Sequence, residues 1–209
     1  MLALAVVLVV LAVLLLAEFL ARYTQIRSEI TRKVVHILVG VFVAFWPFFL
    51  TWTQIQLLSA ALLVVVLISI KLNIFKSIHA VKRNAWGEVL FAVVVGVLAT
   101  VAQDKFIFMA AMLSLSLSDG LAAVIGEKYG VKTQYNVFGR TKSVVGTITF
   151  LVVEVLVMVG YSVFSGIAPS FLIFVWLPVL ATIAENVSGN GTDNLVMPLL
   201  VALILLQVS

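Results

Sequence analysis

Apolar residues in this chain fall into eight long runs that are separated by short polar stretches. The runs cover residues 2–21, 34–50, 54–71, 87–102, 106–125, 143–164, 169–185 and 194–208. A membrane-spanning helix needs about 20 mostly apolar residues, with a range of about 17–25. The pattern therefore predicts an all-α polytopic membrane protein with about eight transmembrane helices.

Composition supports an integral membrane protein. Apolar residues make up 64% of the chain, charged residues only 11%, and the mean hydropathy is +1.26. A soluble domain averages about 45–50% apolar and about 25% charged residues. Neither a repeat nor a linker is evident, so residues 1–209 are expected to form a single domain.

Basic residues are distributed unevenly among the polar gaps. Only Lys105 lies in an even-numbered gap, and the other twelve Lys and Arg residues lie in the first, third and fifth gaps: Arg22, Arg27, Arg32, Lys33, Lys71, Lys76, Lys82, Arg83, Lys128, Lys132, Arg140 and Lys142. Basic loops mark the cytoplasmic side of a membrane protein. We therefore expect these three loops inside and both termini outside. The run at 2–21 has no basic residue before it and is longer than a usual signal core, so a retained helix is expected.

The charge and cysteine content narrow the function further. The formal net charge of +4 comes from these loops and indicates anionic headgroups or an anionic substrate. Aromatic residues do not alternate with the basic ones, so nucleic acid is not an expected partner. Cysteine is absent, which excludes disulfides, thiolate chemistry and Cys-ligated metals.

Carboxylates and cations gather at the predicted cytoplasmic helix ends. Asp119 lies some thirteen residues after the start of the fifth run. At the rise of an α-helix this is about 20 Å from the outer end of the helix, which places Asp119 near the cytoplasmic side. At the same level we expect His36, Glu88, Lys142, Glu185, Asp193 and Asn194. Each residue alone is explained by pairing or by reaching toward the interface, but the set at one depth favours a functional site. Glu154, in the middle of the sixth run, fits a lipid cavity or a bond to a neighbouring helix equally well.

This mixture of groups suits phosphoryl or nucleotidyl transfer. Such chemistry uses Mg²⁺ on one or two carboxylates and cations that offset the charge on the transferred group. The densest stretch runs from Ser118 to Thr147, where Arg140, Lys142 and Ser143 stand just before the sixth run. Together with the free N–H groups of a helix N-terminus, they predict an anion site. A Walker loop is excluded because no GxxxxGK[ST] pattern occurs.

Five short motifs occur in order over most of the chain. They are Arg32-Lys33-Val34-Val35-His36; Trp86-Gly87-Glu88; Ser118-Asp119-Gly120 with Ala122, Ala123 and Gly126; Phe138-Gly139-Arg140-Thr141-Lys142-Ser143 with Gly146-Thr147; and Glu185-Asn186 with Gly191-Thr192-Asp193-Asn194-Leu195 and Pro198. In these motifs the chain resembles the polyprenol kinase family, which includes dolichol kinases, phytol kinases and CTP-dependent diacylglycerol kinases. A second, distant likeness to CDP-diacylglycerol synthases covers only residues 115–147.

The resemblance implies transfer of the γ-phosphoryl group of CTP to the hydroxyl of a membrane isoprenoid alcohol (a polyprenol, dolichol or phytol) at the cytoplasmic face. The alternatives are a phosphatidate cytidylyltransferase and a diacylglycerol kinase. A transporter is less favoured, because it would place charges near the midplane. Expected partners are the lipid alcohol, CTP and membrane lipids, and the expected location is a prokaryotic plasma membrane.

Expected roles follow for individual residues. The catalytic candidates are Asp119, Glu88 and Glu185, and the residues do not decide which one accepts the hydroxyl proton. Asp119 and Asp193 are expected to bind Mg²⁺, with Glu185 and Glu127 as further candidates. Nucleotide binding is expected of Arg140, Lys142, Ser143, Gly146, Thr147, Lys128, Asn194, Lys33 and His36, although His36 fits a packed histidine equally well.

Overall fold

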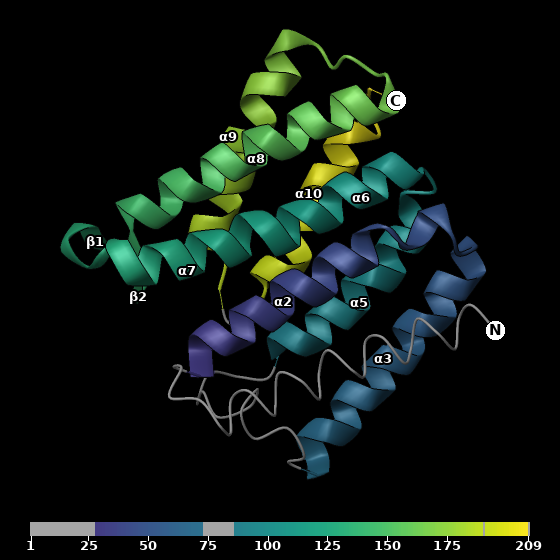
Figure 1. Ribbon diagram of the computed structural model, residues 1–209, viewed down its shortest axis with the longest axis horizontal. Coiled ribbons are helices and arrows are strands. Elements are labelled where there is room, and N and C mark those ends of the chain that lie inside the picture. The colour runs from purple at the N-terminus through teal and green to yellow at the C-terminus, as the bar shows by residue number, and fades with distance from the viewer. Residues whose placement is uncertain (1–27, 73–85, 190, 209) are drawn as a thin grey trace.

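A computed structural model describes residues 28–72, 86–189 and 191–208, which form a bundle of helices with one small hairpin (Figure 1). The elements are α2 (Ser28–Ala44), η1 (Trp46–Phe48), α3 (Trp52–Leu72), α5 (Trp86–Val101), α6 (Lys105–Leu113), η2 (Ser114–Ser118), α7 (Asp119–Tyr129), η3 (Val131–Thr133), β1 (Gln134–Val137), β2 (Arg140–Ser143), α8 (Val144–Ser165), α9 (Phe171–Val187) and α10 (Asp193–Leu205). The run predicted at 2–21 lies outside the described residues, as do Arg22, Arg27, Lys76, Lys82 and Arg83.

Within the described residues, three helices are long and apolar enough to cross a membrane: Trp52–Leu72, Lys105–Tyr129 and Val144–Ser165. Three shorter apolar helices accompany them, at Trp86–Val101, Phe171–Val187 and Asp193–Leu205. Seven of the eight predicted runs thus meet a helix, counting α2. The total of eight spans and the sides of the termini stay predictions.

The helix predicted at 34–50 has different ends in the structure. α2 begins at Ser28 and ends at Ala44, and a short 3-10 helix containing Pro47 follows it. Proline lacks the N–H that an α-helix needs and disfavours helical geometry in the residue before it. Because α2 begins at Ser28, Arg32 and Lys33 lie within a helix and not in a loop, and the helix fixes the directions of their side chains.

The central helix runs from Lys105 to Tyr129, and most of it is buried inside the bundle. Asp104 caps its start by accepting hydrogen bonds from the N–H groups of Phe106 and Ile107, at 2.8 and 2.9 Å. The helix is not regular, because η2 is a π-helical segment between α6 and α7. The helix predicted at 106–125 is present, and it contains a π-helical segment that the sequence analysis did not predict.

The hairpin β1–β2 is a small β element that the all-α prediction did not include, although the described structure is mostly helical. Its strands pair antiparallel, with Val137 opposite Arg140. Phe138 and Gly139 form the turn with φ angles of 49° and 78°, the left-handed geometry of tight hairpin turns. The signal in the sequence is two short runs with β-branched or aromatic residues around a glycine-containing pair. The prediction treated this stretch as a loop, so it placed Arg140 and Lys142 without a rigid element.

Small residues bring α7 and α8 close together. A Cβ atom added to Gly146 would lie 3.0 Å from the carbonyl oxygen of Ala122, and one added to Gly126 would lie 3.1 Å from the Cα atom of Gly146. Such contacts between small residues are how membrane helices approach each other closely. This crossing positions the hairpin, which joins α7 to α8, at one end of both helices (Figure 1).

Candidate functional site

Lys33 and Asp119 form a buried ion pair at the start of α7. The Lys33 Nζ donates to Asp119 Oδ2 at 2.6 Å, and the two side chains are 13% and 5% exposed. His36, one turn further along α2, has its Nε2 3.9 Å from the same Asp119 oxygen and 3.3 Å from the Leu115 carbonyl oxygen. Residues from two separate sequence motifs therefore meet at one point.

A second pair joins the hairpin to α9. Lys142 on β2 donates to the Glu185 carboxylate and also to the Glu185 backbone carbonyl, the latter at 3.3 Å. An ammonium group near the C-terminus of a helix satisfies its last carbonyl groups and interacts favourably with the helix dipole. Asp193 lies within electrostatic range of Asp119, Lys33 and Lys142. The two pairs and Asp193 thus form one cluster of three carboxylates and two ammonium groups.

The loop before α10 contacts the start of α5. Asn194 Nδ2 donates to the Gly87 carbonyl oxygen at 2.7 Å. Gly191, with a φ of 87°, packs its Cα against the Gly87 backbone so closely that a Cβ would lie 2.5 Å from the Gly87 nitrogen. Asn194 therefore connects α10 to α5, and the candidate Glu88 follows directly after this contact. The role expected of Asn194 in nucleotide binding stays a prediction.

Arg140 covers the loop between α9 and α10. Its guanidinium occupies the space that a Cβ on Gly189 would need. Within the described part of the chain the Arg140 side chain makes no hydrogen bond or ion pair. The side chain is half-buried. Because its planar N–H donors are not used by other described residues, they can bind a phosphate.

A hydroxyl network attaches the hairpin to α8 and α9. The Tyr135 hydroxyl contacts the Thr147 hydroxyl and donates to the Asn186 side-chain oxygen. Thr147 was expected to bind nucleotide, and the structure shows its hydroxyl inside this network. Tyr135 was not among the candidate residues, because it falls in strand β1, which the sequence analysis did not predict. Asn186 was visible in the sequence beside Glu185, but without a role.

Ser143 and Gly146 organise the start of α8. The Ser143 side chain caps the helix by accepting from the Gly146 N–H at 3.1 Å. A Cβ on Gly130 would collide with the Ser143 side chain, so α7 and its end pack tightly around this cap. The cap uses one of the N–H groups that the sequence assigned to an anion, and Ser143 and Gly146 therefore have a clear packing role.

Glu154 bonds to the neighbouring helix. It is fully buried in α8 and accepts from the Ser114 hydroxyl at 2.6 Å and from the Ser118 hydroxyl at 2.8 Å. Of the two interpretations that the sequence left open, the interhelical bond is the one observed.

Two predicted residues lie apart from the cluster. Glu127 follows Asp119 by eight residues, which is about 12 Å along an α-helix. Lys128 places its ammonium 5.0 Å from the centre of its neighbour Tyr129's ring. Both residues lie on the part of α7 that leads toward the hairpin.

The carboxylates fit a metal ion that is shared with a substrate. No three His, Cys, Asp or Glu side chains among the described residues converge into a complete metal cage. Mg²⁺ does not require one, because it usually binds one or two carboxylates and takes its other oxygen ligands from phosphates and water. Asp119 and Asp193, which interact electrostatically, could supply those carboxylates.

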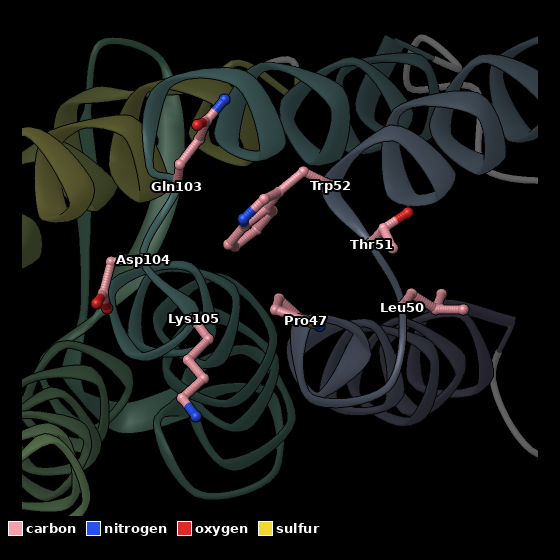
Figure 2. Close-up of a pocket in the computed structure, with 7 residues that line it drawn as sticks. All are labelled: Pro47, Leu50, Thr51, Trp52, Gln103, Asp104 and Lys105. Atoms are coloured by element: carbon pink, nitrogen blue, oxygen red, sulfur yellow. The ribbon is translucent and has the colours of Figure 1, made fainter.

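A surface pocket lies far from this cluster. It is lined by residues from η1 to the start of α3 and from the turn that leads into α6: Pro47, Leu50, Thr51, Trp52, Gln103, Asp104 and Lys105 (Figure 2). Asp104 and Asp119 are fifteen residues apart along the central helix, about 22 Å at the α-helical rise. The pocket is therefore at the opposite end of the bundle from the candidate site.

Comparison with known proteins identifies two relatives. A phytol kinase of Synechocystis sp. (strain ATCC 27184 / PCC 6803 / Kazusa) is 37% identical over 205 residues, covering 92% of this chain and 85% of the relative. The probable phytol kinase 2, chloroplastic, of Oryza sativa subsp. japonica is 26% identical over 215 residues, covering 91% and 70%. No family model matches the chain, and no solved structure gives a significant match.

Proposed function

Because the chain belongs to the polyprenol and phytol kinase family and is a phosphotransferase with an alcohol acceptor, we propose that it transfers the γ-phosphoryl group of CTP to a membrane isoprenoid alcohol. The Synechocystis relative is named a phytol kinase, so phytol is the first substrate to test. The reaction takes place at the cytoplasmic face, where the basic loops of the sequence are expected.

The observation that carries this proposal is the cluster around Asp119. Two ammonium groups, Lys33 and Lys142, are each bound to a carboxylate at one level of the bundle, and Asp193 is close enough to interact with both. A triphosphate brings several negative charges, which such ammonium groups offset. When the ammonium groups turn toward the phosphates, the carboxylates become available to bind a divalent cation and to accept a proton.

Arg140 and Lys142 hold the phosphates in this proposal. Arg140 has no other polar partner among the residues described, and Lys142 lies on the same strand two residues later. Asp119 and Asp193 would hold Mg²⁺, which offsets charge on the phosphates when it is bound. Glu127, eight residues further along α7 than Asp119, is the less favoured ligand because its backbone lies about 12 Å away along the helix.

In the transfer step the alcohol oxygen attacks the γ-phosphorus. The bond between that phosphorus and the β–γ bridging oxygen breaks, and CDP leaves with the electron pair. The hydroxyl proton passes to a carboxylate of the cluster, and the candidates are Asp119, Glu185 and Glu88. The isoprenoid tail stays in the hydrocarbon between helices while the hydroxyl reaches the polar layer.

The test uses purified protein in detergent or nanodiscs with CTP that is labelled at either the γ or the α phosphate. Phytol, a long polyprenol, farnesol and diacylglycerol are offered separately, with ATP as a competing nucleotide. Label from the γ position in phytol or another isoprenoid alcohol supports the proposal. Label only from the α position indicates a cytidylyltransferase, and transfer to diacylglycerol alone indicates a diacylglycerol kinase.

A further inference from the structure

Glu154 is a buried carboxyl group that has no part in the reaction proposed above. It lies near the middle of α8 and is fully buried. Its two oxygens are used separately, since Oε1 accepts from Ser114 and Oε2 accepts from Ser118. Burying a carboxyl group costs several kcal/mol unless hydrogen bonds compensate, and an apolar side chain would fill this space at lower cost. The two hydrogen bonds therefore indicate that Glu154 fixes the geometry of the central helix at Ser114 and Ser118.

The two serines are the first and last residues of η2, the π-helical segment. Such segments are uncommon and occur often at functional sites. One additional residue in a helix turns everything after it by about 100°, because an α-helix has 3.6 residues per turn. Asp119 is the residue directly after η2, so the π-helical segment decides which way its carboxylate points.

Asp119 points to Lys33 on α2, at 2.6 Å, whereas Glu154 binds the same segment from α8. The central helix is thus held from two sides at consecutive residues, Ser118 from α8 and Asp119 from α2. Ser116, in the middle of η2, is different: its hydroxyl donates to the Met112 carbonyl of its own helix at 2.6 Å. It provides a buried serine in the same segment whose hydroxyl donates to the backbone and not to Glu154.

We propose that Glu154 is a positioning residue for the kinase reaction. By accepting hydrogen bonds from Ser114 and Ser118, it holds η2 in the π-helical form that directs Asp119 toward Lys33 and the substrate. This inference rests on the proposed function in assigning Asp119 to the site. Glu154 itself touches neither the nucleotide nor the alcohol.

The experiment compares Glu154→Leu, Glu154→Gln, the double variant Ser114→Ala/Ser118→Ala and the control Ser116→Ala. Leucine keeps much of the volume and removes both acceptors, whereas glutamine keeps one acceptor oxygen and its amide NH2 group can donate to the oxygen of the other serine hydroxyl. For each variant kcat, the KM for CTP, the melting temperature and hydrogen exchange of the 114–119 segment are measured in the same detergent.

Glu154→Leu is expected to lower kcat at least about tenfold, since misplacing a reacting group by about 1 Å has costs of this order or larger. The KM for CTP should change less than about twofold, because the phosphate-binding side chains lie elsewhere. Hydrogen exchange of the 114–119 segment should increase. The serine double variant should reproduce these changes, Glu154→Gln should restore most of kcat, and Ser116→Ala should resemble the unmodified protein.

The proposal is overturned if kcat per folded molecule is unchanged in both Glu154→Leu and the serine double variant, or if Ser116→Ala loses as much. If Glu154→Leu does not fold, the serine double variant decides alone, since it retains the native α8. Asp119→Asn is measured alongside. If Asp119→Asn keeps near-normal turnover, Asp119 itself has no role in the reaction. If Asp119→Asn is inactive while the Glu154 and serine variants are normal, Asp119 keeps its role and only the positioning role of Glu154 is refuted.

Discussion

The Lys33 ammonium group lies 2.6 Å from the Asp119 carboxylate and joins α2 to the start of α7 across 86 residues of sequence. Both side chains are largely shielded from solvent, so each depends on the other for its hydrogen bond. His36 lies beside the pair and supports the same corner of the bundle. The contact therefore links two helices, and it also fixes the position of Asp119, the central carboxylate of the proposed site.

Removing Lys33 should destabilise the protein more than neutralising Asp119. Lys33→Met leaves a buried carboxylate without its partner, and we expect the free energy of unfolding to fall by about 3 kcal/mol. Asp119→Asn should cost less, because the long Lys33 side chain can turn its ammonium toward water. Denaturant or thermal unfolding in one detergent measures both. The double variant should be more stable than Lys33→Met alone, and a larger loss for Asp119→Asn would contradict this account.

Asp119→Asn should lower kcat by about 100-fold or more, because it removes a charge from the reacting centre. Its melting temperature should stay close to that of the unmodified protein. Phosphoryl transfer from γ-labelled CTP to phytol measures the rate. Glu185→Gln and Glu88→Gln, assayed together with it, show which carboxylate contributes most. Turnover near normal in Asp119→Asn would exclude it as metal ligand and as proton acceptor.

Arg140→Ala should raise the KM for the nucleotide by about ten- to a hundredfold, since a hydrogen bond to a charged group contributes about 1.5–3 kcal/mol. Its melting temperature should not change, because the guanidinium has no polar partner in the described part of the structure. Lys132→Ala is the matched control: it removes an exposed cation just before the hairpin. Equal effects of the two substitutions on KM would indicate that general positive charge, and not Arg140, attracts the nucleotide.

Gly191→Ala should destabilise the protein more than Gly166→Ala. Both glycines have positive φ angles, 87° and 72°, and a left-handed residue with a side chain costs about 1–2 kcal/mol. Only Gly191 also contacts a backbone, that of Gly87, whereas a Cβ on Gly166 would meet nothing within 4 Å. The amount by which Gly191→Ala lowers the free energy of unfolding beyond Gly166→Ala measures how closely the loop before α10 packs on the start of α5. Activity should fall as well in Gly191→Ala, and similar stabilities of the two variants would contradict the close contact.

Much of the helical layout follows from local properties of the chain. Apolar runs at 54–71, 87–102 and 143–164 predicted α3, α5 and α8 within about two residues, because hydropathy is summed over consecutive residues. The end of α2 was misplaced, since Pro47 interrupts an apolar run without changing its hydropathy. The hairpin was missed because its strands are short and their polar residues resemble those of a loop.

The sequence by itself determined the class of protein, most of the helices and the level at which the polar residues gather, since composition, hydropathy and helix length depend only on neighbouring residues. It also indicated the kinase family, which the similarity to the phytol kinase relatives supports. The tertiary structure alone decided the pairs, Lys33 with Asp119, Lys142 with Glu185 and Glu154 with Ser114 and Ser118. These pairs depend on how each helix is rotated about its axis. A π-helical segment and a two-residue hairpin turn change the directions of the side chains that follow them, and neither leaves a strong signal in the amino-acid pattern.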